Sequence, residues 1–237
     1  MPEPNEALEL TRLVVHSIDA ATNAVTFASG NRYEGDYVNG YLHGRGKYTW
    51  ADGTSFTGTF RKNRITGEGE YQWRDGTCYS GGVKQGIRQG HGTVTKPGCR
   101  YVGDIVDGMP HGHGVMTAVK GTYDGEWAHG VMHGQGVMRY ATGNHYTGQW
   151  RHGKRHGQGQ MTWAKRHEFY DGAWRDGLPH GYGYYRWTIP HINRCRLTYD
   201  DEYWGEWQNG KRHGACRMRY ADSRVFVGRY ENDWKQG

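Results

Sequence analysis

Long hydrophobic runs are missing from the 237-residue sequence. The longest aliphatic run is Leu13-Val14-Val15, whereas a membrane-spanning helix needs roughly 20 apolar residues. The opening residues, MPEPNEALEL, are acidic, whereas a secretory signal is basic and then apolar. The four cysteines lack the close spacing of metal ligands. We therefore expect a soluble protein with reduced thiols that resides in the cytoplasm.

Glycine and aromatic residues are what the sequence has in excess. Its 39 glycines are about twice the average usage near 7%. Aromatic residues make up 14% of the chain, although the mean hydropathy is only -0.95. Disordered chains are poor in aromatic side chains, so we expect a folded protein that buries rings with little Leu, Ile or Val.

The glycine excess belongs to a tandem repeat of about 23 residues, counted here from an aromatic residue at position one. The best-formed unit, YDGEWAHGVMHGQGVMRYATGNH, runs from Tyr123 to His145. Glycine holds positions three, eight, twelve and fourteen in seven to nine of the nine units. The units begin at Tyr33, Phe56, Tyr79, Tyr101, Tyr123, Tyr146, Tyr170, Tyr203 and Phe226.

Each unit alternates polar and small or aromatic residues with a period of two, which indicates β-strands. Dipeptides such as Asn39-Gly40 inside a unit are hairpin turn signals, and Asp52-Gly53 turns the chain into the next unit. We therefore predict an all-β fold: an elongated, single-sheet, solenoid-like meander of eight complete hairpins and a partial ninth.

The sequence divides into a lead and a repeat array. Residues 1–32 form an N-terminal lead with capping strands, predicted at Leu13–Val15 and Val25–Phe27. Residues 33–237 form the array, interrupted by an insertion at about residues 188–202.

Rings at positions one, five and eighteen need apolar cover, so we expect them to lie over bare backbone at glycine positions three, twelve and fourteen. The tryptophans at position five should then form a structural aromatic row with rings at near-neighbour distances along the array. They are Trp127, Trp150, Trp174 and Trp207.

The pattern resembles the MORN repeat over Tyr33 to Gly237, on segments such as Tyr33-Glu34-Gly35 and His133-Gly134-Gln135-Gly136. The lead LTRLVVHS, the segment Thr49 to Gly53 and the insertion also resemble the radial spoke head component 10 family, homologue B. This resemblance implies a non-catalytic scaffold in the axoneme of the motile cilium or flagellum. Its partners would be other radial spoke head proteins.

The sequence offers little for catalysis or ligand chemistry. Six histidines occupy position eleven, about 10 Å apart along the array, and Zn–N bonds are only about 2.1 Å. We expect these histidines to cap backbone groups. The segments 148–154 and 205–211 match the glycines and lysine of a P-loop, but arginine follows where Ser or Thr must hold Mg²⁺. We therefore expect no catalytic residue, no cofactor and no bound metal.

The surplus of positive charge lies in the second half, which has 18 Lys and Arg against 12 Asp and Glu. Lys154-Arg155, Lys211-Arg212 and Lys165-Arg166 are expected to line one edge and to contact an acidic protein surface or, alternatively, a phosphoinositide membrane. The simpler alternative is that solvated turns collect charged residues. We expect no nucleic-acid binding, because stacking there needs exposed rings.

Two further contact regions are predicted. The insertion offers Ile189, Pro190, Ile192 and Tyr199 to a partner. The last strand of the array should leave an unpaired edge, which is a template for homodimerisation or for docking to another protein.

Overall fold

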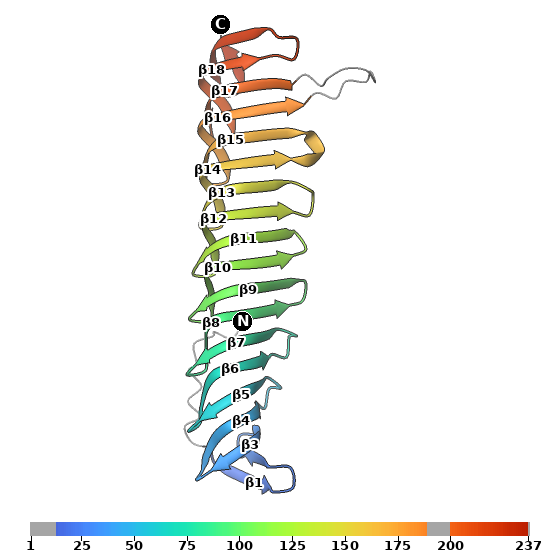
Figure 1. Cartoon of the computed structure of the whole chain (residues 1–237), viewed down its shortest axis with the longest axis vertical. Helices are drawn as coiled ribbons and strands as arrows, with labels where there is room; N and C mark the ends of the chain where they lie inside the picture. Colours follow the sequence, from blue (N-terminus) through green and yellow to red (C-terminus); the bar gives the residue numbers. More distant parts are fainter. Residues whose placement is uncertain (1–12, 189–199, 237) are drawn as a thin grey trace. The chain divides into compact units, whose positions relative to one another are not determined.

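The computed structural model describes residues 13–188 and 200–236, which form tandem antiparallel hairpins and one short 3-10 turn (Figure 1). The chain divides into two compact units, Met1–Thr117 and Ala118–Gly237. In each unit, every strand pairs with its neighbours in the sequence. The prediction of an all-β meander of tandem hairpins is therefore confirmed.

The strands of the first unit are β1 (Val15–Asp19), β2 (Ala24–Phe27), β3 (Arg32–Val38), β4 (Tyr41–Thr49), β5 (Ser55–Arg61), β6 (Arg64–Gln72), β7 (Cys78–Lys84), β8 (Ile87–Lys96), β9 (Cys99–Val106) and β10 (Met109–Ala118). Those of the second unit are β11 (Gly121–Ala128), β12 (Val131–Tyr140), β13 (His145–Arg151), β14 (Lys154–Trp163), β15 (Glu168–Arg175), β16 (Leu178–Thr188), β17 (Asp200–Gln208), β18 (Lys211–Arg219), β19 (Val225–Glu231) and β20 (Trp234–Gln236). The 3-10 turn Ala164–Arg166 joins β14 to β15.

The tip of each repeat hairpin is a two-residue turn at positions seven and eight. Both residues have positive φ, for example 52° at Asn39 and 80° at Gly40. This is the type I′ geometry that matches the twist of the flanking strands. The turn persists at Lys62-Asn63, where no glycine is present. The tips are therefore defined by their backbone conformation and not by glycine alone. Dipeptides such as Asn39-Gly40 predicted the positions of the tips correctly.

A β-bulge interrupts seven of the repeat hairpins after position three: β3–β4, β5–β6, β7–β8, β11–β12, β13–β14, β15–β16 and β17–β18. In β11–β12, Gly125 pairs with Gly136, but the next pair joins Trp127 to Met132. Glu126 therefore faces a longer stretch of β12, in which Gly134 has a φ of 52°. The Glu126 carboxylate accepts a hydrogen bond from the Gln135 amide at 2.9 Å. Bulges bend the strand that carries them, which brings the hairpin around its buried rings.

The glycines serve two purposes. At position fourteen the prediction of bare backbone under a ring is confirmed: a Cβ on Gly136 would lie 2.6 Å from the Tyr123 ring. At position twelve the prediction is wrong. A Cβ on Gly134 would meet the Glu126 carboxylate instead of a ring, and the residue is needed for its positive φ in the bulge.

The lead caps the first repeat through β2. Ala24, Val25 and Phe27 are buried, and the Phe27 ring lies 6.0 Å from the Tyr48 ring. The first capping strand begins at Val15 and ends at Asp19, later than predicted. Asp19 accepts hydrogen bonds from the Ala21 amide and the Thr22 hydroxyl, which closes the turn after this strand.

Strand pairing extends into both ends of the predicted insertion. Thr188 ends β16 and pairs with Asp200, and Glu202 pairs with Arg186. The two ends of the predicted insertion therefore belong to the β16–β17 ladder. The predicted contact residues Ile189, Pro190, Ile192 and Tyr199 lie outside the described residues.

Candidate functional site

The buried rings of the second unit alternate between tyrosine at position one and tryptophan at position five. Tyr146 lies 5.1 Å from Trp150 and 5.3 Å from Trp174, with interplanar angles of 89° and 84°. The same edge-to-face contacts recur for Tyr123 with Trp127 and Trp150, for Tyr170 with Trp174 and Trp207, and for Tyr203 with Trp207.

The predicted tryptophan row is therefore half of a mixed row. Trp127, Trp150, Trp174 and Trp207 are each at most 7% exposed, and a tyrosine separates each from the next. Edge-to-face pairs at these distances add about 0.5–1.5 kcal/mol beyond burial of area. Ring contacts therefore join each repeat to the next. Because the rings of this row are buried, none of them is accessible to a ligand.

Hydrogen bonds hold the same rings in place. The Tyr146 hydroxyl donates to the bulge carbonyl of Gln149 at 2.9 Å. The Trp150 indole donates to the Gly136 carbonyl of the preceding repeat at 3.2 Å, and the Trp174 indole donates to Gly159 at 2.8 Å. The Tyr146 hydroxyl therefore satisfies a carbonyl of the bulge, and the two indoles bond their rings to the preceding repeat, whereas the Trp207 indole nitrogen has no hydrogen-bond partner among the described residues.

Burial of the position-one tyrosines changes their ionisation. Loss of solvent raises the pKa of Tyr33, Tyr79 and Tyr101 to about 12. Burial also raises the pKa of Tyr123 and Tyr146 far above its ordinary value. These phenols are neutral hydrogen-bond donors near neutral pH.

Arg155, predicted as a partner contact, is half-buried and packs against the next repeat. Its guanidinium lies 4.4 Å from the centre of the Trp174 ring and donates to the Gly177 carbonyl at 2.7 Å. It occupies position ten, where Leu42 and Ile65 are buried in other repeats. Position ten therefore faces the core, and this comparison between repeats is the sequence signal that places Arg155 inside.

Arg212 repeats the arrangement two repeats later. Its guanidinium lies 4.4 Å from the centre of the Tyr230 ring, and its Nε atom donates to Asp233 at 3.0 Å. Arg88 does the same in the first unit, with a hydrogen bond of 2.8 Å to the Gly108 carbonyl. These arginines join one hairpin tip to the next, so their charges are already engaged.

The three predicted basic dipeptides do not share one edge. Lys154 and Lys211 are exposed at hairpin tips, at the start of β14 and β18. Lys165 and Arg166 lie in the 3-10 turn beyond the far end of β14, so the length of that strand separates them from Lys154. Arg166 also pairs with Glu168 at 3.6 Å.

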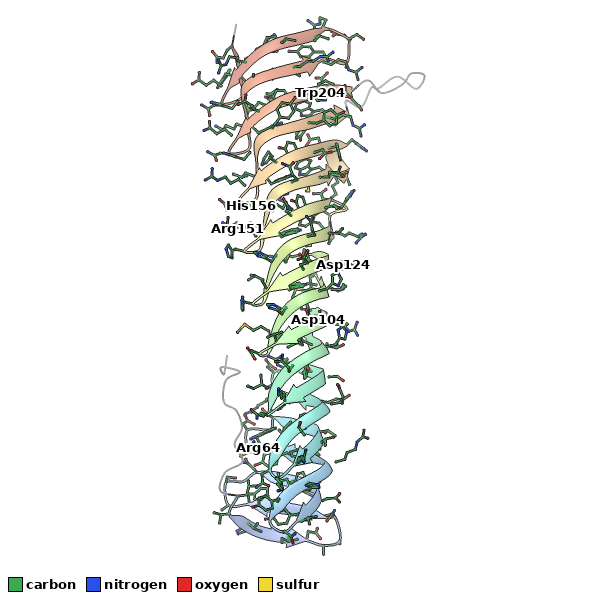
Figure 2. The ribbon with its side chains drawn as sticks, turned by 60° about the vertical axis from the view of Figure 1, so that its left-hand side comes forward. Arg64, Asp104, Asp124, Arg151, His156 and Trp204 are labelled. Carbon is green, nitrogen blue, oxygen red and sulfur yellow. The ribbon has the colours of Figure 1, made fainter. Side chains whose placement is uncertain are left out.

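Sequence reasoning missed two exposed cations at the hairpin tips. Arg151 is the last residue of β13 and pairs across the tip with Lys154. Arg175 ends β15, at the tip of the next hairpin. Figure 2 shows Arg151 and His156 at the same edge of the sheet. Alternation along the strand predicts both arginines as outward-facing, since position five faces the core and position six does not.

The histidines of the tips lie close together without forming a metal site. The rings of His133 and His152 are 6.0 Å apart. The Nδ1 atom of His180 accepts a hydrogen bond from the Asn209 amide at 3.5 Å, as the capping prediction requires. The Nδ1 atoms of His156 and His213 have no partner. Across the described ranges, no group of three or more potential metal ligands is present.

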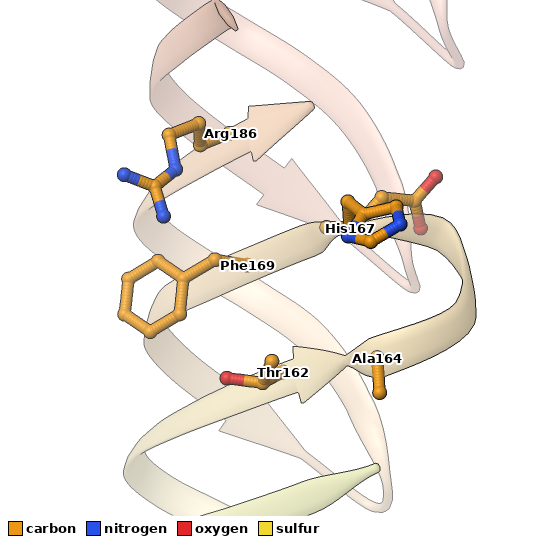
Figure 3. Close-up of a pocket in the computed structure, with 6 residues that line it drawn as sticks. Thr162, Ala164, His167, Phe169 and Arg186 are labelled. Carbon is orange, nitrogen blue, oxygen red and sulfur yellow. The ribbon is translucent and has the colours of Figure 1, made fainter. Parts of the chain in front are cut away.

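A shallow pocket of about 230 Å³ lies beside the 3-10 turn. Figure 3 shows Thr162, Phe169 and Arg186 on successive strands at one side of it, with Ala164 and His167 at the turn. Its charged groups are already paired: Glu168 accepts a hydrogen bond from the Tyr185 hydroxyl at 2.8 Å, and Arg186 lies 3.4 Å from Asp200. The pocket offers no nucleophile with a supporting base.

Three successive rings outside positions one, five and eighteen lie on the sheet face opposite the core. Phe169, Tyr184 and Trp204 follow one another on β15, β16 and β17, with Tyr184 5.2 Å from Trp204. The Tyr184 hydroxyl donates to Glu202 at 2.8 Å. These rings occupy outward positions that are polar in most other repeats.

Comparison with known families agrees with the geometry. The MORN repeat matches residues 33–55, 56–78, 79–98, 101–122, 123–145, 146–167, 170–189 and 203–223. These matches cover more than half of the chain, which therefore belongs to the MORN-repeat proteins. A search of curated proteins finds no match. Within the described residues, no helix is long and apolar enough to cross a membrane.

Proposed function

We propose that this MORN-repeat protein is a non-catalytic scaffold of the radial spoke head in the axoneme of a motile cilium or flagellum. MORN repeats are typical of proteins that contact other proteins or membranes. The radial spoke assignment is supported by the resemblance of residues 10–17, residues 49–53 and the insertion.

The observation that carries the scaffold role is the alternating row of tyrosine and tryptophan. Edge-to-face ring contacts connect the alternating tyrosines and tryptophans, from Tyr123 to Trp207, across consecutive repeats. The hydrogen bond from the Gly177 amide to the Arg155 carbonyl, 2.9 Å long, also joins neighbouring tips. Such contacts favour a stiff sheet that displays its hairpin tips and outer face to partners.

The partners in this proposal are other radial spoke head proteins. We propose three contact regions on this chain: the insertion, the exposed hairpin tips and the edge strand β20. Trp234 of β20 is 75% exposed. Among the described strands β20 pairs only with β19, and an unpaired strand edge offers hydrogen-bonding groups to a second chain. Homodimerisation through β20 is one form that this contact takes.

The test is fractionation of motile cilia after detergent removes the membrane. Mass spectrometry should find this chain's peptides in the axonemal pellet and not in pellets from a strain without radial spokes. Release with the membrane fraction, or equal retention in the spokeless strain, would contradict the proposal.

A second candidate is an adaptor that tethers a partner to an anionic phosphoinositide membrane. It is favoured by the exposed cations of the second unit, and it is weakened because Arg155 and Arg212 are engaged internally. Flotation with phosphatidylinositol-bisphosphate vesicles tests it. The tether would be favoured over the scaffold by vesicle binding that persists after washing without detergent. The double variant Lys154→Glu with Lys211→Glu should then lose this binding.

A further inference from the structure

The tip of the hairpin β13–β14 contains two like charges directly opposite each other. Arg151 and Lys154 are cross-strand partners, and both are exposed. Like charges in this arrangement repel and destabilise a hairpin. Among the described residues, neither side chain has an ion-pair partner.

The neighbouring strands add more basic groups around this pair. On one side, Gly134 pairs with Trp150, so His133 lies next to Arg151. On the other side, Gly157 pairs with Trp174, so His156 lies next to Arg175. Of the acidic residues in the two neighbouring hairpins, Glu126 accepts a hydrogen bond from the Gln135 amide, and Asp176 lies in the turn of the next hairpin. Positive charge is therefore concentrated at this tip with little compensation.

The cations continue along the same edge of the second unit. The next tip carries Arg175, and the tip after it carries Lys211, both exposed. Direct hydrogen bonds join the tips of β13–β14 and β15–β16, since Arg155 donates to Gly177 at 2.7 Å. With two strands per repeat, successive tips lie about 9.6 Å apart.

We propose that Arg151, Lys154, Arg175 and Lys211 form a binding site for an acidic, extended polypeptide segment of a partner protein. This inference deepens the proposed scaffold role, on which it rests, by giving the chemistry of the partner. The partner's carboxylates relieve the repulsion between Arg151 and Lys154.

The linear arrangement favours a polypeptide over a membrane. A segment in the extended polyproline II conformation has three residues per turn and advances about 3.1 Å per residue, so carboxylates three residues apart lie on one side and repeat every ~9.3 Å. That repeat matches the distance from one tip to the next. A membrane would bind best to cations spread over a plane, whereas Arg151, Lys154, Arg175 and Lys211 follow the line of the hairpin tips.

The experiment measures binding of a fluorescein-labelled glutamate-rich peptide of about twelve residues, which spans on the order of 40 Å when extended. Fluorescence anisotropy with the full chain should show saturable binding that weakens as salt is raised. The variant Arg151→Gln with Lys154→Gln should bind about fivefold more weakly, a change of about 1 kcal/mol for the two exposed ion pairs lost together.

A matched control removes the same charge from the opposite edge. Lys165→Gln with Arg166→Gln should leave peptide affinity within about twofold of the original protein. Equal losses in the two variants would overturn the proposal, because the effect would then follow net charge alone. Absence of saturable peptide binding, or tighter binding to phosphatidylserine vesicles or single-stranded DNA than to the peptide, would also overturn it.

Stability separates loss of binding from loss of folding. Removal of the repulsion should leave the melting temperature of Arg151→Gln with Lys154→Gln unchanged or higher, while peptide affinity falls. A lower melting temperature would contradict the repulsion argument. Failure of this binding assay is distinguishable from failure of the scaffold role, because axonemal retention is measured separately.

Discussion

At the scale of single residues, the repeat is built from one aromatic side chain and the glycine beneath it. Tyr146 is fully buried, and a Cβ on Gly159 would overlap its ring. Phe56 occupies the equivalent position in the second repeat, which shows that a ring is required there and a hydroxyl is not. The Tyr146 hydroxyl adds the hydrogen bond to Gln149. The ring and the glycine beneath it therefore depend on each other, and a substitution of either one alone disturbs their packing.

We expect Gly159→Ala to lower the free energy of unfolding by about 1–3 kcal/mol, because the added methyl group displaces the Tyr146 ring. Urea unfolding followed by tryptophan fluorescence measures this change. The control is Gly153→Ala at the neighbouring hairpin tip, where φ is 75° and no atom lies within 4 Å of the new Cβ. That variant should lose only about 1 kcal/mol of backbone strain. A loss at Gly159 no larger than at Gly153 would contradict the ring-over-glycine account.

At the scale of the hairpin, adjacent basic residues have opposite roles. Lys154 and Arg155 are neighbours in the sequence, yet Lys154 is exposed and Arg155 packs on Trp174. Successive side chains of a strand point to opposite faces. The dipeptide thus supplies one cation to the surface and one to the contact between tips.

We expect Arg155→Ala to lower the free energy of unfolding by about 1–2 kcal/mol, because it removes a ring contact and leaves the Gly177 carbonyl with one partner fewer. Lys154→Ala should change it by less than about 0.5 kcal/mol. Arg155→Met should recover much of the loss, since Met132 fills position ten in the preceding repeat. Denaturant unfolding of the three variants is the measurement, and equal effects of Arg155→Ala and Lys154→Ala would refute the assignment.

At the scale of the whole molecule, the tyrosine core couples folding to alkaline pH. The pKa of Tyr33, Tyr79 and Tyr101 is raised by burial to about 12, from an ordinary value of 10.0. A raised folded-state pKa means that the unfolded chain loses these protons first. The contribution to stability is therefore fully present below pH 10 and is lost as pH rises toward 12.

We expect the melting temperature to hold steady up to pH of about 9.5 and then to fall steeply as the unfolded-state tyrosines ionise. Differential scanning fluorimetry across pH 7 to 11.5, with absorbance of tyrosinate near 295 nm, measures both events. The tyrosinate of the buried phenols should appear together with unfolding, as a second rise after that of the exposed tyrosines. Ionisation of all the tyrosines at pH near 10 without unfolding would contradict burial of these phenols.

The fold was accessible from the sequence because its signals are local and repeated. The period-two pattern and turn pairs such as Asn39-Gly40 located the hairpins. The glycine at position twelve was misread, since the need for positive φ at Gly134 follows from a bulge that pairing between strands creates. The sequence predicted only part of the basic site. It marked the hairpin tip at Lys154, but the core-facing direction of Arg155 emerges only when position ten is compared between repeats.

The sequence by itself determined the repeat, the strand alternation and the hairpin turns, because each depends on residues close together in the chain. It also determined which family the chain belongs to. Only the tertiary structure decided that tyrosines separate the tryptophans, that Arg155 and Arg212 face rings of the next repeat, and that Arg151 lies opposite Lys154. The physical reason is that these contacts join residues of neighbouring strands, and register and bulges set which side chains meet there.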